Sequence, residues 1–555
     1  MSLRLAGLGL MLAGVSACAG DRGVGPGPQP QCASRITPLS LGVGQYLSID
    51  PAVDSGCVAI AVNPSTTDSA EYLLVAQAVT GQPGLTASFA LQGQVRQGAV
   101  ATVSPPMAPD LAQRFHDALR EMEQRHAYGG LPLVADRELA APFRVPPDSG
   151  SSRQFSVCAN LDCSSFAVVT ATAAVVRGPI AIFVDTAAPS PGLTQADLDS
   201  LAADLSTRLY AVDTTAFGRE SDIDSNQVVI VLMTPVVNRL VTPLQCATSG
   251  YVSGFFLGGD IDPALRGDAR FNQGEIVYSL VADSLGTASC PHRPSRVKQL
   301  FPVTFVHELQ HMISFNQHVL LRGGPEEELW LNEALSQFAE ELGGRSFGIG
   351  TTQFSTFAIG DVRNAYQYLE ATGSNFLVTT SGIGSLAERG AGWLFVRYLD
   401  DRFRTDTSLA ATAAFTRGLL ETSHTGATNV AAHTGVGFET LVARWALANF
   451  VSDLDTVSAF QPPPELTYTS WRLRATYRSL HLQDPATFPA VYPLAPAATS
   501  GPNVDVAGTL RSGSGVYVRA VQAPGASGFT LRLAAPGGGP LSAAVAARLG
   551  VIRIR

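Results

Sequence analysis

Two histidines and a glutamate stand close together in the stretch Val303–Ile313: His307, Glu308 and His311. On a helix, residues four apart share a face, so both imidazoles can reach one metal ion. Glu308 lies one position further round, where its carboxylate can reach a water held by that ion, as a general base requires. The spacing predicts a Zn²⁺ site with His307 and His311 as ligands and Glu308 as the base.

The rest of this stretch is mostly apolar, which predicts that the helix is buried. The apolar positions are Val303, Val306, Leu309, Met312 and Ile313. Ionisable side chains are costly to bury unless they are paired or bind a metal. A metal ion would explain why two histidines stand on a buried helix.

A third ligand is expected because catalytic zinc usually takes three protein ligands and keeps one position for water. The extended pattern HExxHxxGxxH would place Gly at 314 and His at 317, but the chain has Ser314 and Gln317. His318 is one residue out of register, so we expect it to flank the end of the helix.

Residues 326–342 offer the other source of a ligand, a second helix that carries carboxylates. Its apolar positions define a buried stripe: Trp330, Ala334, Leu335 and Phe338. Glu333 adjoins this stripe, where an acid is costly unless it is paired or binds a metal. Glu333 is therefore the first candidate, with Glu340 and Glu341 as substitutes.

The segments 307–311 and 330–336, HELQH and WLNEALS, resemble the gluzincin pattern of HExxH followed by NExxS. The closest resemblance is to the hyicolysin-type neutral metallopeptidases. It extends over roughly residues 178–450, through 222–226, 274–278 and 390–399. The resemblance implies a gluzincin-like fold, Glu333 as the third zinc ligand, and hydrolysis of protein or peptide substrates.

The chain also departs from that pattern. In thermolysin-like relatives, the residue four after the ligand glutamate is often an Asp that orients the first histidine, whereas this chain has Gln337. A neutral amide raises imidazole basicity less than a carboxylate does. We therefore expect weaker zinc binding or a lower rate than in those relatives.

The sequence does not identify two further parts of such a site, the oxyanion donor and the strand that binds the peptide. A donor must stabilise the oxyanion that forms when water attacks a carbonyl, and no spacing singles one out among Tyr366, Tyr368, His424 and His433. The segment Glu275–Leu280 is either the sheet edge on which a peptide adds as an extra strand or an ordinary core strand.

Asp222, Asp224 and Asn226 present oxygens at alternate positions, which is half of a calcium-loop signature. Gln227 and Met233 stand where that signature needs Gly and Glu. Both a Ca²⁺ site and a polar turn before the next strand remain possible interpretations.

The first residues have the pattern of an export signal. Arg4 supplies the positive start, Leu5–Leu12 the apolar stretch, and Val15–Cys18 a small-residue cleavage site that ends in cysteine. This resembles a bacterial lipoprotein signal, which implies a lipid on Cys18 and a membrane anchor; an ordinary secretory signal is the alternative. We expect export to the outer membrane or cell surface, or to the periplasm.

Six cysteines remain after Cys18, an even number that suits an oxidising compartment. The simplest pairing is sequential: Cys32 with Cys57, Cys158 with Cys163, and Cys246 with Cys290. The net charge of -9 would repel a phosphate backbone, so nucleic-acid binding is not expected.

The 555 residues predict several domains in an α+β chain. We expect a signal peptide over 1–17, a Gly- and Pro-rich tether over 18–31 and an N-terminal β-sandwich-like domain over 32–105. A connecting helix and strands over 106–177 follow, with His116 and His126 on the helix surface. The metallopeptidase domain spans 178–460 and a C-terminal β domain 461–555.

Two rival functions remain at this level. The first is a non-catalytic surface lipoprotein that binds partners through its β domains, against which the intact ligands and base argue. The second is a zinc hydrolase that acts on a non-peptide bond, which the motif does not distinguish from a peptidase.

Overall fold

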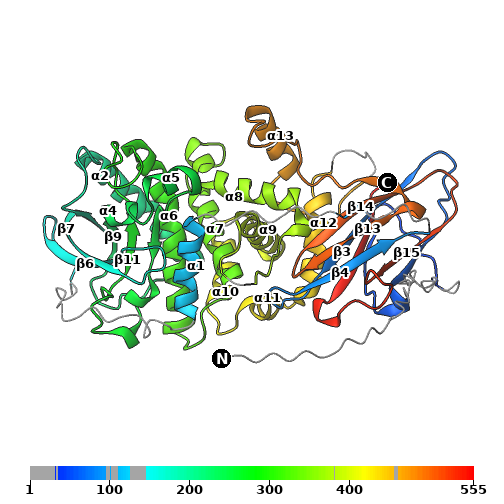
Figure 1. Ribbon diagram of the computed structural model, residues 1–555, viewed down its shortest axis with the longest axis horizontal. Helices are drawn as coiled ribbons and strands as arrows, with labels where there is room; N and C mark the ends of the chain where they lie inside the picture. Colours follow the sequence, from blue (N-terminus) through cyan, green and yellow to red (C-terminus); the bar gives the residue numbers. More distant parts are fainter. Residues whose placement is uncertain are drawn as a thin grey trace, which may run out of the picture.

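The computed structural model describes residue 32 and residues 36–94, 100–101, 111–124, 145–380, 382–454 and 460–555. Figure 1 shows three parts in a row: a mixed sheet with helices, a central group of helices, and a pair of β-sheets. The expected α+β class is confirmed. The signal peptide, Cys18, the tether and His126 lie outside the described residues.

The first part is built on a six-stranded sheet in the order β10-β11-β9-β8-β7-β6. The strands are β6 (Ser152–Cys158), β7 (Phe166–Arg177), β8 (Ile180–Asp185), β9 (Val229–Met233), β10 (Gly254–Phe256) and β11 (Ile276–Ser279). Neighbours β8, β9 and β11 run parallel, while β6, β7 and β10 pair antiparallel. Because β6 and β7 belong to this sheet, residues 152–177 are part of the first domain rather than a connection to it.

The sheet edge differs from the one considered in the sequence. β11 lies between β9 and β10, so it is an internal strand, and β10 forms the edge. β10 has only three residues, Gly254–Phe256, which is too short for an alternating pattern to reveal a strand.

Helices pack beside this sheet, and two of them begin at clear sequence signals. Thr194 forms a capping box with Asp197 at the start of α2, and Pro294 occupies the first turn of α6. The helices are α2 (Gln195–Asp204), α3 (Tyr210–Phe217), α4 (Pro235–Asn238), α5 (Pro243–Ser249) and α6 (Pro294–Phe315), with π-helical turns at Leu205–Leu209 and Asn316–Leu320.

The middle of the molecule is helical. It contains α7 (Leu329–Arg345), α8 (Thr352–Glu370), α9 (Leu386–Phe403), α10 (Leu409–Leu420), α11 (Gly426–Thr434), α12 (Phe438–Val451) and α13 (Leu473–Gln483). α7 packs against α6, α8 and α9, so the two helices expected to carry the metal ligands lie side by side. α13 falls within the segment expected to be a C-terminal β domain.

The third part is a β-sandwich made from both ends of the chain. Its sheets have the orders β1-β16-β3-β14-β12 and β2-β15-β4-β13-β5. The strands are β1 (Tyr46–Ile49), β2 (Cys57–Ile60), β3 (Ala70–Ala78), β4 (Thr86–Gln92), β5 (Val100–Ala101), β12 (Ala498–Ser500), β13 (Asp505–Arg511), β14 (Gly515–Gln522), β15 (Phe529–Ala534) and β16 (Ala547–Arg553). Separate N- and C-terminal β domains were the wrong prediction, because periodicity locates strands but does not specify their partners.

Strand β3 joins the sandwich to the helical part. Alternate side chains on a strand point to opposite faces, and here both faces are buried. Leu74 and Ala76 enter the sandwich core, whereas Leu73 and Val75 belong to the large core that the helices and the six-stranded sheet share.

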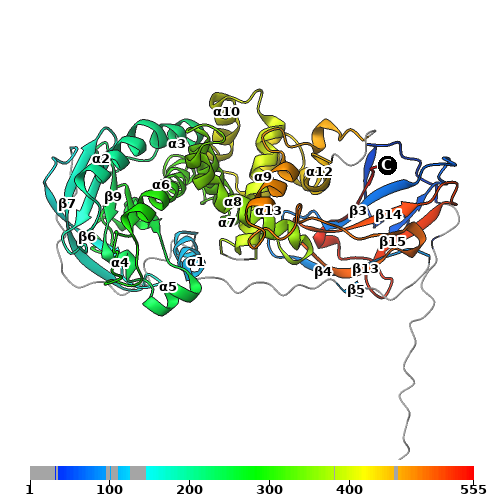
Figure 2. The same cartoon turned by 90° about the horizontal axis from the view of Figure 1, so that it is seen from above.

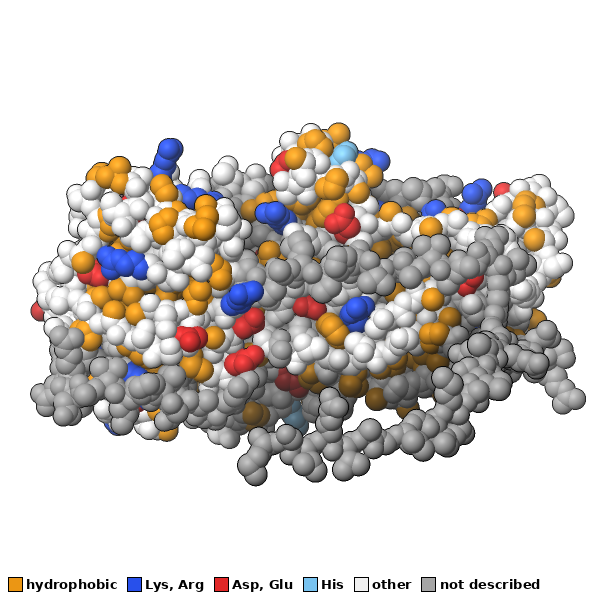
Figure 3. Space-filling view, in the orientation of Figure 1, with side chains coloured by type: hydrophobic (Ala, Val, Ile, Leu, Met, Phe, Trp, Pro, Cys, Tyr) orange, Lys and Arg blue, Asp and Glu red, His pale blue; other side chains and the backbone are white. Residues whose placement is uncertain are grey.

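All three predicted disulfides are present: Cys32–Cys57, Cys158–Cys163 and Cys246–Cys290. On the face in Figure 3, acidic and basic side chains are interspersed over the middle of the molecule. No helix in the described part of the chain has the length and apolar content needed to cross a membrane.

The predicted connecting helix is α1 (Leu111–Gln124). It does more than connect the sandwich to the six-stranded sheet, because it contacts β10 and α6. Figures 1 and 2 show it next to α6, with the central helices on its other side. Its contacts with β10 and α6 bring it into the candidate site.

Candidate metal centre

His307, His311 and Glu333 converge at the contact between α6 and α7. The Nε2 atoms of the two histidines lie 3.2 Å apart. The Glu333 carboxylate lies 3.5 Å from Nε2 of His307 and 3.2 Å from Nε2 of His311. All three side chains are buried. The structure therefore brings together the three residues predicted from the sequence as ligands.

These separations fit a Zn²⁺ ion. Ligand bonds of about 2.0–2.1 Å in a tetrahedron place neighbouring donor atoms roughly 3.3–3.4 Å apart, close to the three measured distances. Apart from the two imidazoles, no described residue donates a hydrogen bond to Glu333, whose two oxygens are buried. Two nitrogens and one carboxylate are also the donor set of many catalytic zinc sites.

The charge around the ligands also suits a cation. Burial disfavours the imidazolium of His307, but Glu333 and Glu340 outweigh it and raise the pKa of His307 to about 10. Burial lowers the pKa of His311 to about 3. The buried carboxylates therefore stabilise one positive charge, on the imidazole of His307. A divalent cation between the ligands would supply positive charge at the same place.

A carboxylate does orient the first histidine, but it is not at the expected position. Oε1 of Glu340 lies 2.7 Å from Nδ1 of His307, whereas Gln337 is buried and its Oε1 has no hydrogen-bond partner. Glu340 follows Glu333 by seven residues, two helical turns, so both face α6. Because Glu340 supplies the carboxylate next to His307, the neutral Gln337 is no longer a reason to expect weaker zinc binding.

The second histidine also has a polar neighbour. The hydroxyl of Ser336 lies 3.2 Å from the Nδ1 atom of His311 and donates a hydrogen bond to Gln310. Such contacts fix the orientation of a ligand ring.

Glu308 lies beside the ligands, with its carboxylate held by two donors. Its Oε2 accepts hydrogen bonds of 2.9 Å from the backbone N–H of Phe256 and from Nη2 of Arg120. Burial raises the pKa of Glu308 to about 7, with Arg120 opposing the shift. A carboxylate with a pKa near 7 is suited to general acid–base chemistry at neutral pH.

His116 does not lie on the surface of a connecting helix, so that prediction from the sequence was wrong. Its side chain is 14% exposed, and its Nδ1 lies 3.9 Å from Oε1 of Glu308. Burial lowers the pKa of His116 well below its usual value. Arg120 was missed and His116 was misplaced because the docking of α1 depends on tertiary contacts. The only local signal is a set of charged residues next to the apolar positions Phe115 and Leu119.

A cavity of about 470 Å³ opens beside the site. Its walls come from α1, α6, α7, α8, α9 and Ser253 before β10, and they include His116, His307, Glu308, Glu340, Phe357 and Arg389. Arg389, at the start of α9, places its Nη1 3.9 Å from Glu333. The cavity therefore offers a cationic donor next to the ligands.

The oxyanion donors considered in the sequence lie elsewhere. The hydroxyl of Tyr366 contacts the backbone of Ala490, and that of Tyr368 contacts Ser514. His424 is exposed and His433 packs against Phe415. Arg389 was missed, although it directly precedes the segment 390–399 in which the resemblance was noted.

Two of the weaker ligand candidates, His318 and Glu341, have other partners. His318 lies in the π-helical turn after α6, with Nε2 3.8 Å from the buried Glu327, so it flanks the helix end as expected. Glu341 is bound by arginine and tryptophan side chains and is not part of the site; its partners are Arg345, Arg397, Trp393 and Trp471.

The predicted calcium loop is only partly assembled. Asp222 and Asp224 come together with Glu275, with one oxygen of each within 4.8 Å of the others. Asn226 instead donates to Asp224 and accepts from the backbone of Val228. Oε2 of Glu275 is buried without a hydrogen-bond partner, and burial raises the pKa of Asp224 to about 7.

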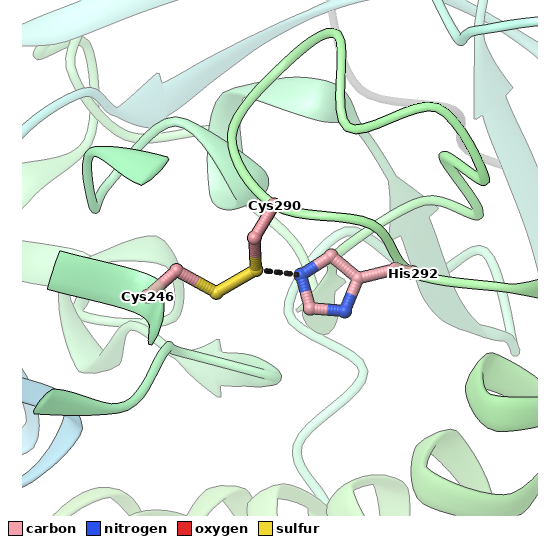
Figure 4. Close-up of side chains that lie close together, drawn as sticks. All are labelled: Cys246, Cys290 and His292. Carbon is pink, nitrogen blue, oxygen red and sulfur yellow. Dashed lines mark hydrogen bonds between the residues drawn. A yellow bond between two sulfur atoms is a disulfide. The ribbon is translucent and has the colours of Figure 1, made fainter. Parts of the chain in front are cut away.

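A third group of potential ligands is closed by a disulfide. Figure 4 shows Cys246, on α5, joined to Cys290, with the ring of His292 directed at the Cys290 sulfur. Nε2 of His292 lies 3.4 Å from that sulfur. Because both sulfurs are bonded to each other, this group does not bind a metal in its oxidised form.

A scan against models of known protein families found no match to this chain. A search of the curated proteins found no relative.

Proposed function

We propose that the chain is a zinc-dependent endopeptidase of the hyicolysin type, exported as a bacterial lipoprotein through Cys18. The observation that carries the proposal is the convergence of His307, His311 and Glu333, with ligand atoms 3.2–3.5 Å apart, next to the buried carboxylate of Glu308. The three disulfides support an oxidising compartment, at the outer membrane, cell surface or periplasm.

Each residue has a role in peptide hydrolysis. His307, His311 and Glu333 would hold Zn²⁺, which supplies a Lewis acid that polarises the scissile carbonyl and acidifies water. Glu308 takes the proton from the attacking water and returns it to the leaving amine. Arg389 faces the negative charge that develops on the carbonyl oxygen. Edge strand β10 offers backbone groups on which an extended peptide can pair.

The proposal is tested with casein and an internally quenched peptide. We expect cleavage that a chelator abolishes and Zn²⁺ restores, and a loss of about 10²–10⁴-fold in Glu308→Gln with zinc content unchanged. Glu370→Gln, an exposed glutamate on α8, is the matched control. Chelator-resistant cleavage, or full activity of Glu308→Gln, contradicts the assignment.

The same samples separate the two rival functions. Stoichiometric zinc with no peptide cleavage but turnover of an ester substrate points to a hydrolase of a non-peptide bond. The absence of both zinc and turnover points to a protein that acts only through binding.

We also propose Ca²⁺ at Asp222, Asp224 and Glu275. The support is the buried, unpartnered Oε2 of Glu275 between two further carboxylates, since oxygen-rich sites suit this ion. Calcium should raise the melting temperature of the wild type and have no effect on Glu275→Gln. An equal response of the two proteins would rule the site out.

A further inference from the structure

An arginine outside the expected metallopeptidase segment binds the general base. Nη2 of Arg120, on α1, donates to Oε2 of Glu308 at 2.9 Å. The two side chains are 1% and 2% exposed. A buried, charge-assisted hydrogen bond of this kind is strong and occupies one of the two carboxylate oxygens. Glu308 is thus already engaged by α1 before any substrate arrives.

The same helix binds the sheet edge. Glu123, paired with Arg120 at 2.6 Å, accepts a hydrogen bond of 2.7 Å from the backbone N–H of Gly258, just after β10. Arg120 also lies 3.5 Å from the carbonyl oxygen of Phe256. An extended peptide adds to an edge strand through its backbone groups. Side chains of α1 therefore occupy the edge that a substrate needs.

The apolar face of α1 fits the same place. Phe115 and Leu119 are fully buried, and the Phe115 ring packs edge-to-face on Phe255 of β10 with centroids 5.0 Å apart. A Cβ atom on Gly258 would come within 3.0 Å of the Glu123 side chain. The surface after β10 is thus shaped to receive the helix.

The opposite side of α1 is also fixed. Oδ1 of Asp117 accepts a hydrogen bond of 2.5 Å from the backbone N–H of Ile383, in the loop before α9. A Cβ atom on Gly382 would come within 2.3 Å of the same carboxylate. α1 therefore bridges the two sides of the site, from β10 to the loop that leads to Arg389.

We propose that α1 is a built-in inhibitor that occupies the substrate position along β10 and blocks the general base through Arg120. The proposal rests on the proposed peptidase function. Release of α1 frees the Oε2 atom of Glu308 and exposes the backbone edge of β10 and the apolar surface around Phe255. The released site takes an extended peptide, with an apolar side chain in the space that Phe115 leaves.

Arg120 has an alternative role, in which it is a positioning residue that holds Glu308 in place for catalysis. Both roles use the same ion pair, but they predict opposite effects on activity. Removal of an inhibitor raises activity, whereas removal of a positioning residue lowers it.

The experiment compares wild type with Arg120→Ala, Arg120→Glu and Asp117→Ala. Arg120→Glu places a carboxylate against Glu308 and Glu123, and Asp117→Ala removes the contact with Ile383 without touching Glu308. Arg114→Ala, an exposed arginine on the same helix, is the matched control. The measurements are kcat/KM on a quenched peptide, the binding rate of a fluorescent peptide hydroxamate to the zinc-loaded protein, and hydrogen exchange of residues 111–124.

We expect at least about a tenfold gain in kcat/KM, faster hydroxamate binding and faster exchange in Arg120→Glu, since about 1.4 kcal/mol lost from docking corresponds to a factor of ten. Arg120→Ala and Asp117→Ala should shift in the same direction by less, and Arg114→Ala should match the wild type. A folded Arg120→Ala that loses activity while the exchange of 111–124 is unchanged overturns the proposal.

The readouts separate this proposal from the peptidase assignment. Faster hydroxamate binding and exchange without any peptide cleavage support α1 as an inhibitor and count against the peptidase. Cleavage by the wild type with no gain in any of the three variants supports the peptidase and overturns the inhibitor. Hydrogen exchange requires neither metal nor substrate, and Asp117→Ala provides the result if the buried Arg120 variants fail to fold.

Discussion

Oε1 of Glu340 lies 2.7 Å from Nδ1 of His307, so the helix that contributes the third ligand also orients the first. Replacing Glu340 with Gln removes the charge but keeps the shape. We expect zinc affinity to fall by about 10- to 100-fold, as for other outer-shell carboxylates. A competitive chelator titration measures the change, with the exposed Glu421→Gln as control. An unchanged affinity would mean that Glu340 only fills space.

The thermal stability of the wild type should depend on bound zinc, and this dependence should disappear when the third ligand, Glu333, is removed. A ligand that binds only the folded chain raises its stability by mass action. We therefore expect a chelator to lower the melting temperature of the wild type but not that of Glu333→Gln, whose zinc content should be close to zero. Scanning calorimetry with and without chelator tests this. A mutant that retains stoichiometric zinc would require another acid as ligand.

Arg389 is expected to act on the rate rather than on metal binding. Loss of one donor to a developing oxyanion costs about 10²–10³-fold in kcat. We expect Arg389→Ala to lose activity in this range with KM and zinc content little changed, and Arg389→Lys to recover part of it. A parallel loss of zinc in Arg389→Ala would show that the arginine serves Glu333, 3.9 Å away, instead of the substrate.

Asp260 should make stability depend on pH. It is fully buried, and it accepts hydrogen bonds from the Asn272 backbone and the Tyr278 hydroxyl at 2.6 and 2.5 Å. Burial raises the pKa of Asp260 from 3.8 to about 7, with Asn272, Tyr278 and Arg153 opposing the shift. Because the folded state binds this proton more tightly than the unfolded chain does, the stabilisation is fully present below pH 3.8 and is lost as the pH rises from there through about 7.

The free energy of unfolding should therefore fall between about pH 4 and pH 7, and it should fall less steeply in Asp260→Asn. Urea unfolding at several pH values gives both slopes. Identical slopes for the two proteins would show that Asp260 stays ionised throughout.

The ligands could be predicted from the sequence because each depends on local periodicity. His307, Glu308 and His311 share a helix, and Glu333 stands out as an acid beside an apolar stripe. Glu340 was considered only as a substitute ligand, since its contact with His307 depends on how α7 crosses α6. Arg120 was missed altogether, because nothing local to α1 shows which cleft the helix enters.

The fold shows the same division. The location of the sandwich strands, within residues 32–105 and 461–555, was predicted from the sequence. Their pairing was not, because β1 joins β16 across more than 500 residues of chain, as in Tyr46 with Ile552. Only the packing of side chains in the folded core distinguishes the correct strand partner from the other strands.

The sandwich built from both chain ends has a consequence for the order of assembly. β3 finds its neighbours β14 and β16 only after residues 515–553 have been synthesised, so this early strand stays unpaired on both sides until late in synthesis. Contacts this distant in sequence slow folding and leave strand edges exposed meanwhile. During its production the protein should therefore depend on holding chaperones, and a chain cut short before β16 should aggregate even though every residue of the metal centre is present.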